Sequence, residues 1–233
     1  MRRQEGPQTS ATAACPSPYE PARILHRSKD SMRAAPLALA CSLAALPAVT
    51  QSAVDPARAL AAGAAAEKSG SYAEALRQYT LGAEAGDPAC MNALGDLHYD
   101  GHGVPQSFPQ ALAWYRKAAA KGLRDAQHNL GFCHANGQGV SKDMAEAVRW
   151  YRLAADQGFA KSQANLATAL IEGSGVAKDP VEGRRWLEKA AQQGLVRAQR
   201  LLGYHHWSRT FGARDAEKAY TWFKQAADQE DPF

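Results

Sequence analysis

The feature that most constrains this chain is a sequence pattern that returns every 36 residues. The segments beginning at Gly101, Gly137 and Gly173 share the order Gly-x-Gly-Val, a tryptophan, paired alanines and a closing glycine. The tryptophan column consists of Trp114, Trp150, Trp186 and Trp222. A period of this length indicates an array in which each unit buries its apolar face against its neighbours. We therefore expect stacked repeats rather than one globular core.

The second helix of each unit is predicted to begin at a regularly placed capping residue. Short polar side chains, which favour the position before a helix, recur at Ser71, Ser107, Asp143, Asp179 and Asp215. Three residues after the first four of these stand Glu74, Gln110, Glu146 and Glu182. This spacing predicts four capping boxes, in which each of the two side chains accepts a backbone N–H of the first turn. Pro180 follows Asp179 at the first helical position, which suits a residue without an N–H.

The glycines of the repeat follow a helix rather than a strand. Residues 88–100 place Leu94, Leu97 and His98 on one helical stripe. Gly101 comes directly after this helix, where a left-handed residue commonly ends it, and Gly103 lets the chain double back. A dinucleotide-binding loop instead follows a buried strand and occurs once per site. We therefore predict turns here, and no cofactor.

Five units account for the chain after residue 53: a degenerate first unit (54–86), three full units (87–122, 123–158 and 159–194) and a degenerate last unit (195–233). Residues 93–122 and 129–158 carry Leu-Gly, Gly-x-Gly-Val, Trp-Tyr, Ala-Ala and Gly in this order, and they resemble Sel-1-like repeats, relatives of tetratricopeptide repeats. The resemblance implies an all-α fold, a right-handed α-solenoid of stacked antiparallel helix pairs whose first helices line a concave face. It also implies an adaptor in protein–protein complexes, of a type that bacteria often export.

Residues 32–53 have the order of a secretory signal peptide. Met32 and Arg33 precede an uncharged stretch that reaches Val49, and the small residue Ala53 ends the segment. We expect residues 1–31 to be a mis-assigned or disordered extension. The mature protein is then periplasmic or secreted, with membrane contact only through the export signal. An uncleaved anchor and lipidation at Cys41 remain as alternatives.

The charge balance argues against a nucleic-acid partner. The chain has 27 Lys and Arg against 23 Asp and Glu. Residues 1–53 hold six of the basic and three of the acidic residues, which leaves 21 against 20 for residues 54–233. Nucleic-acid binding needs clustered basic side chains that displace counterions, and the sequence after residue 53 has no basic run.

Two cysteines fall within the repeats, and their register argues against a disulfide. Cys133 corresponds to position 97 one unit earlier, seven residues from Cys90. Seven helical residues span about 10 Å, in addition to the roughly 8–10 Å between packed helix axes. A disulfide needs Cα atoms within about 7 Å. We therefore expect both residues to pack as small apolar side chains.

Catalytic and metal-binding patterns are weak in this sequence. His98, His134 and His206 share one column of the repeat, but Leu170 interrupts this column between His134 and His206. No further potential ligand has the spacing of a metal site. We expect these histidines to fill a space that the family usually gives to tyrosine. Residues 54–233 contain no Ser-x-x-Lys, Gly-x-Ser-x-Gly or His-Glu-x-x-His pattern. We therefore predict no metal and no enzyme.

Positions that differ between units are free to bind a ligand, because the recurring positions build the solenoid. On the first helices, residues i, i+4 and i+7 form one stripe. We call it the variable stripe. Its partner-binding candidates are Asn92, Asp96, Tyr99, His128, Phe132, Thr168, Ile171, Arg200, Tyr204 and Trp207. Aromatic and arginine side chains are frequent interface anchors.

We therefore predict a non-catalytic adaptor or regulator of the bacterial envelope that binds a protein or peptide in the concave groove. Two alternatives remain open. One is a β-lactam or cell-wall amide hydrolase or binder, by analogy with cysteine-rich relatives, whose cysteine pairs this sequence lacks. The other is a purely structural envelope scaffold.

Overall fold

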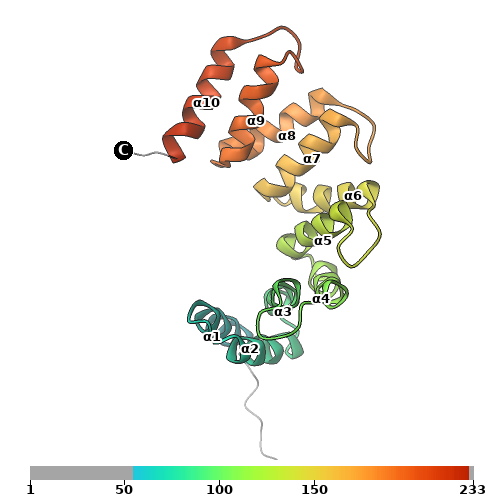
Figure 1. The fold of residues 1–233 in the computed structure, drawn as a ribbon, viewed down its shortest axis with the longest axis vertical. Coiled ribbons are helices and arrows are strands. Elements are labelled where there is room, and N and C mark those ends of the chain that lie inside the picture. Colours follow the sequence, from blue (N-terminus) through green and yellow to red (C-terminus); the bar gives the residue numbers. More distant parts are fainter. Residues whose placement is uncertain (1–54, 231–233) are drawn as a thin grey trace, which may run out of the picture. The chain divides into compact units, whose positions relative to one another are not determined.

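The computed structural model describes residues 55–230, which form ten α-helices (Figure 1). The helices are α1 (Pro56–Lys68), α2 (Tyr72–Glu84), α3 (Pro88–Asp100), α4 (Phe108–Ala120), α5 (Arg124–Asn136), α6 (Met144–Asp156), α7 (Ala160–Glu172), α8 (Pro180–Gln192), α9 (Val196–Trp207) and α10 (Ala216–Glu230). No strand occurs among these residues, so the all-α prediction is confirmed. None of the ten helices is both long and apolar enough to cross a membrane. The predicted extension, signal peptide and lipidation site lie outside the described residues.

Consecutive helices form five hairpins, from α1–α2 to α9–α10, and the second helix of each hairpin packs against the first helix of the next (Figure 1). This is the solenoid of stacked helix pairs that the 36-residue period predicts. Its core contains a column of fully buried leucines, which are Leu94, Leu130, Leu166 and Leu202. Full burial of one leucine contributes about 2 kcal/mol relative to an exposed leucine, so each unit adds a similar increment to the stack.

The starts of the second helices agree with the sequence prediction in part. The side chains of Ser107, Asp143 and Asp179 accept the N–H three residues later, as predicted. Ser71 makes no such bond. The other half of the predicted capping box is wrong. The backbone N–H groups of Ser107, Asp143 and Asp179 do not bond the side chain three residues later. They donate instead to the carbonyl oxygens of His98, His134 and Leu170, respectively. Those carbonyls belong to the paired first helix, so each cap also closes its hairpin.

The repeated glycines make turns, as predicted, and the second one of each pair also sets the distance between units. Gly101 has a left-handed φ of 76° and ends α3. Gly139 has φ 70°, and a Cβ atom there would lie 2.6 Å from the carbonyl carbon of Phe108, the first residue of α4. The loop after α5 therefore lies directly against the start of the second helix in the preceding hairpin.

Glycines within the first helices make room for an aromatic ring of the second helix. A Cβ atom on Gly131 would lie 2.7 Å from the ring of Tyr151, which is 4% exposed. In the next unit the same two columns hold Ala167 and Leu187, both fully buried. A larger residue on the first helix thus accompanies a smaller one on the second, and each pair fills a similar space between the two helices.

Glutamine pairs tie the two helices of a hairpin together, and two of the same glutamines also bond the preceding unit, a feature that the sequence does not announce. Buried glutamines of the first helices accept a hydrogen bond of 2.8 Å from glutamines 30 residues later in the same unit, in the pairs Gln127–Gln157, Gln163–Gln193 and Gln199–Gln229. Gln163 also donates to the carbonyl oxygen of Ala155, at 3.2 Å. Each bond links a first helix to the end of a second helix, so it fixes the register of packing.

The cysteines and the histidines of the shared column bury polar atoms in the packed stack. Cys90 and Cys133 are buried free thiols, and desolvation raises their pKa to about 12 and about 11. His98 and His134 bury their Nδ1 atoms without a hydrogen-bond partner. Residues 55–230 contain no group of three or more His, Cys, Asp or Glu side chains arranged to hold a metal ion.

Candidate partner-binding surface

Three pockets border the variable stripe on the first helices, and we name them by the helices that form them. The α3–α5 pocket has a volume of about 310 Å³. Its lining includes Asp96, Tyr99, His128 and Phe132 from the stripe. The α5–α7 pocket includes Phe132 and Thr168, and the α9–α10 pocket includes Arg200 and Tyr204. Most of the predicted residues therefore lie at depressions between or beside neighbouring units.

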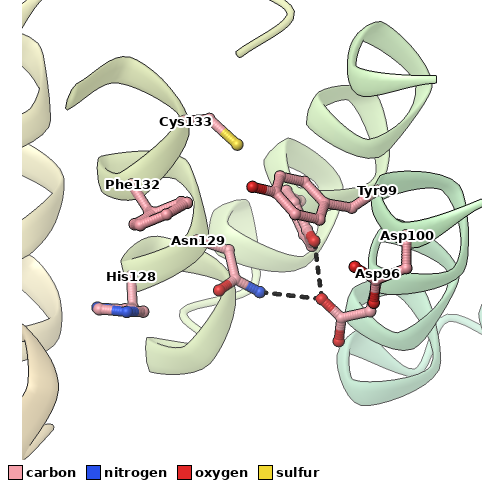
Figure 2. Close-up of a pocket in the computed structure, with 8 residues that line it drawn as sticks. Asp96, Tyr99, Asp100, His128, Asn129, Phe132 and Cys133 are labelled. Atoms are coloured by element: carbon pink, nitrogen blue, oxygen red, sulfur yellow. Dashed lines mark hydrogen bonds between the residues drawn. The ribbon is translucent and has the colours of Figure 1, made fainter. Parts of the chain in front are cut away.

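The carboxylate of Asp96 is the centre of a hydrogen-bond network in the α3–α5 pocket (Figure 2). Its Oδ1 accepts hydrogen bonds from the Tyr115 hydroxyl at 2.7 Å and from the Asn129 amide at 3.2 Å. Its Oδ2 accepts one from the amide of Asn92 at 3.0 Å. Asn129 also donates to Asn92 Oδ1 at 3.1 Å. One carboxylate thus connects α3, α4 and α5.

Burial in an acidic neighbourhood raises the pKa of Asp96 to about 6. Desolvation is the main cause, and the negative charges of Asp100, Glu67 and Asp125 act in the same direction. The hydrogen bond from Tyr115 opposes the shift without cancelling it. At neutral pH the pocket therefore contains a carboxylate whose hydrogen-bond donors are uncharged and whose nearby charged residues are acidic.

Aromatic rings form the wall of the pocket above this carboxylate. Figure 2 shows Tyr99 on the α3 side and Phe132 on the α5 side. Their ring centroids are 6.5 Å apart, and Tyr99 also contacts Phe108 edge-on. The Tyr99 hydroxyl donates to Gln138 Oε1 at 2.8 Å, which fixes the ring in place. Phe132 is 41% exposed, so its ring is open to a ligand.

His128 lies at the far side of the same pocket, and its imidazole already contacts other residues of the chain. Its Nδ1 is 2.8 Å from the hydroxyl of Ser162, and its ring contacts Phe159 and Tyr151. Burial and the nearby positive charges of Lys161 and Arg197 lower its pKa to about 4. The imidazole is therefore neutral at physiological pH and serves as a packed, polar wall.

The stripe continues into the α5–α7 pocket with one exception. Thr168 lines this pocket, and its hydroxyl donates back to the Ala164 carbonyl. Ile171 is 5% exposed and belongs to the core, so the expectation that it faces a ligand is wrong. The reason is Gly183 on α8, where a Cβ atom would lie 2.7 Å from Cγ1 of Ile171. The missing side chain leaves a space that Ile171 fills.

The last part of the stripe is strongly exposed. Tyr204 and Trp207 on α9 are 57% and 50% exposed. The guanidinium of Arg214 lies 3.1 Å from the centroid of the Trp207 ring, which holds one face of the indole. Arg200 and Arg197 line the α9–α10 pocket beside Tyr204. This end of the first-helix surface is therefore basic and aromatic, whereas the α3–α5 end is acidic and aromatic.

Some residues of the surface escaped the sequence analysis. Asn129, Tyr115 and Arg197 lie outside the i, i+4, i+7 selection, although Asn129 donates to Asp96 and Arg197 donates to Asn165. A signal was available for Asn129, because its column holds Ala, Asn, Asn and Leu and so varies between units. Tyr115 gave no such signal, since its column is mostly aromatic and builds the core.

The side chains exposed on this surface are suited to contacts with a ligand. His128 and Ser162 form a Ser–His contact, but Ser162 is fully buried, so its hydroxyl cannot reach a substrate in this conformation. The exposed groups are aromatic rings, amides, carboxylates and guanidinium groups. These are the groups that recognise peptide side chains and backbone through apolar contact and charge-assisted hydrogen bonds.

Comparisons with known proteins agree with this architecture. A model of the Sel1 repeat matches residues 88–123, 124–159, 160–195 and 196–231, and each segment begins at the first residue of α3, α5, α7 or α9. Residues 54–86 lie outside these matches. A comparison with curated proteins gave no match.

Solved structures that are similar to the chain include two Sel1-like repeat proteins. The first is c5321, a protective antigen present in uropathogenic Escherichia coli strains and displaying an SLR fold. It is 36% identical with a TM-score of 0.72, over 76% of this chain and 39% of its own. The second is a Sel1 repeat protein from Oxalobacter formigenes, 32% identical with a TM-score of 0.69, over 72% of this chain and 69% of its own. The chain thus spans about two fifths of the length of the first relative. With four matched repeats over more than half of its length, the chain belongs to the Sel1 repeat family.

Proposed function

We propose that the first-helix surface binds a segment of another protein and that the chain is a non-catalytic adaptor. Sel1 repeat proteins are in general scaffolds of protein–protein interaction. The observation that carries the proposal for this chain is the row of pockets at the variable stripe, where charged and aromatic side chains occupy positions that differ between units. An extended contact over several units suits an α-solenoid, because each unit adds a small part of the binding surface.

Burial of aromatic side chains supplies most of the affinity in this proposal. Phe132, Tyr204 and Trp207 are 41%, 57% and 50% exposed on first helices. Covering such a side chain with a partner contributes about 1–2 kcal/mol. The acidic and basic ends of the surface would then determine the direction in which a charged segment lies.

The proposal includes export to the envelope, which rests on the signal-like order of residues 32–53. A fractionation of cells that express the full chain tests this part. Recovery of a shortened chain in the periplasmic or secreted fraction supports it, and recovery of the full-length chain in the cytoplasm contradicts it.

The binding surface is tested by cross-linked pull-down with the full chain and two triple variants. The test variant changes Phe132, Tyr204 and Trp207 to Ala on first helices. The matched control is a triple alanine variant of equally exposed apolar side chains on the second helices α6, α8 and α10, which are Leu153, Val181 and Tyr220. A partner that the wild type and the control capture, and that the test variant loses, supports the proposal. Equal capture by all three proteins contradicts it.

A further inference from the structure

We propose that the α3–α5 pocket binds a basic side chain, an arginine or a lysine, of the partner segment. This inference rests on the proposed function and adds the chemistry of one contact to it. Three features of the molecule support it: the charges around Asp96, the aromatic wall of the pocket and the columns of the repeat.

The carboxylate of Asp96 has no ion-pair partner among the described residues, and the positive charges of Lys161 and Arg197 act on His128 at the far side of the pocket. Asp96 has three neutral hydrogen-bond donors, from Asn92, Tyr115 and Asn129. The charged groups with the largest effect on it are Asp100, Glu67 and Asp125, and all three are acidic. A partly buried carboxylate in such surroundings gains most from a positive charge, since the low local dielectric strengthens an ion pair. A guanidinium or ammonium group supplies that charge.

The shape of the pocket fits the same ligand. Tyr99 and Phe132 face the cavity above the Asp96 carboxylate (Figure 2). Asp100, the last residue of α3, also lines the cavity. A cation between aromatic rings is stabilised by their negative faces. Arginine is the better fit of the two, because its planar group can stack on a ring and donate to the two carboxylates at once. The volume of about 310 Å³ accommodates such a head group.

The repeat shows that the fold does not require this acid. The column of Asp96 holds Phe132, Thr168 and Tyr204 in the three units that follow. One unit after Tyr115, the hydroxyl of Tyr151 has the neutral amide of Asn165 as its hydrogen-bond partner. In the next unit, a neutral side chain therefore serves as the hydrogen-bond partner of the tyrosine hydroxyl in this column. The carboxylate at position 96 is a specific feature of one pocket.

A random peptide library displayed on phage tests the inference, with the full chain as the immobilised target. We expect the peptides selected on the wild type to share an arginine or lysine at one position. The same selection is repeated on Asp100→Asn and on Asp96→Asn. Asp100 is exposed at the end of a helix, so its variant keeps the fold even if Asp96→Asn disturbs the network.

The affinity of the best selected peptide is then measured by calorimetry. We expect each substitution to weaken binding by about tenfold or more, because it removes one side of a partly buried charge pair. Asp156→Asn on α6, an exposed acid away from the pocket, is the matched control and should bind as the wild type does. Replacing the shared basic residue of the peptide by glutamine should weaken binding to the wild type and should weaken binding to Asp100→Asn by a smaller factor, because Asp96 remains in that variant.

The outcomes separate the two proposals. Peptides that bind the first-helix surface without a shared basic residue overturn the inference and leave the proposed function in place. Equal affinity of the wild type and both acidic-site variants overturns it as well. Failure of the library to yield any peptide on the wild type contradicts peptide binding itself, and the basic-side-chain inference with it.

Discussion

The packing of Gly131 against Tyr151 leads to a prediction that separates local helix propensity from tertiary packing. Gly131 lies within α5, where replacement by alanine would add about 1 kcal/mol of stability from propensity alone. A Cβ atom at this position would lie 2.7 Å from two ring carbons of Tyr151 and 3.2 Å from the carbonyl oxygen of Ala147. Contact at these distances forces the ring or the helices apart.

We therefore expect Gly131→Ala to destabilise the protein. Overpacking a well-filled site costs about 1–3 kcal/mol, and more when backbone atoms resist. Tyr151 is nearly fully buried, so its ring cannot turn out to solvent. After the gain in helix propensity, the net loss in the free energy of unfolding should be up to about 2 kcal/mol. Urea unfolding monitored by far-ultraviolet circular dichroism measures it.

The next unit indicates which second substitution should compensate for Gly131→Ala. It carries Ala167 and Leu187 in the same two columns. We expect Tyr151→Leu to restore much of the stability that Gly131→Ala removes, with a coupling of about 1–2 kcal/mol in a double-mutant cycle. The reverse change, Ala167→Gly, has no clash to relieve and should cost about 1 kcal/mol. Stabilisation by Gly131→Ala, or strict additivity of the two substitutions, would refute the reasoning.

Three further predictions concern other contacts of the stack. Gln163→Met keeps the side-chain volume but removes the bonds to Gln193 and Ala155, so the free energy of unfolding should fall by about 1–2 kcal/mol in urea unfolding. Asp179→Ala removes two N-cap hydrogen bonds and should cost about 1 kcal/mol in the same assay. The folded pKa of Asp96 is raised from 3.8 to about 6, so its contribution to stability is present below about pH 4 and lost as pH rises through about 6. The shift corresponds to about 3 kcal/mol, and the melting temperature of Asp96→Asn relative to the wild type should therefore increase between pH 4 and pH 7.

The sequence by itself determined the secondary structure and the order of stacking. Helical periodicity, capping residues and closing glycines are local signals, and they recur at 36 residues, so each unit confirms the others. The range predicted for the first helix of the second unit, residues 88–100, is the range of α3. Burial of the leucine column followed from the same pattern, because a stack of identical units leaves one side of each helix in the core.

The tertiary structure decided which variable residues are available to a partner. Ile171 shares the stripe pattern with Tyr99 and Trp207, but a glycine on a different helix provides the space that buries it. The pairing of the N-cap N–H groups with the preceding helix, and the convergence of Asn92, Tyr115 and Asn129 on Asp96, also depend on contacts between helices. Periodicity along one helix carries no information on these contacts, because the volume and the polarity that face a side chain are set by residues of another element.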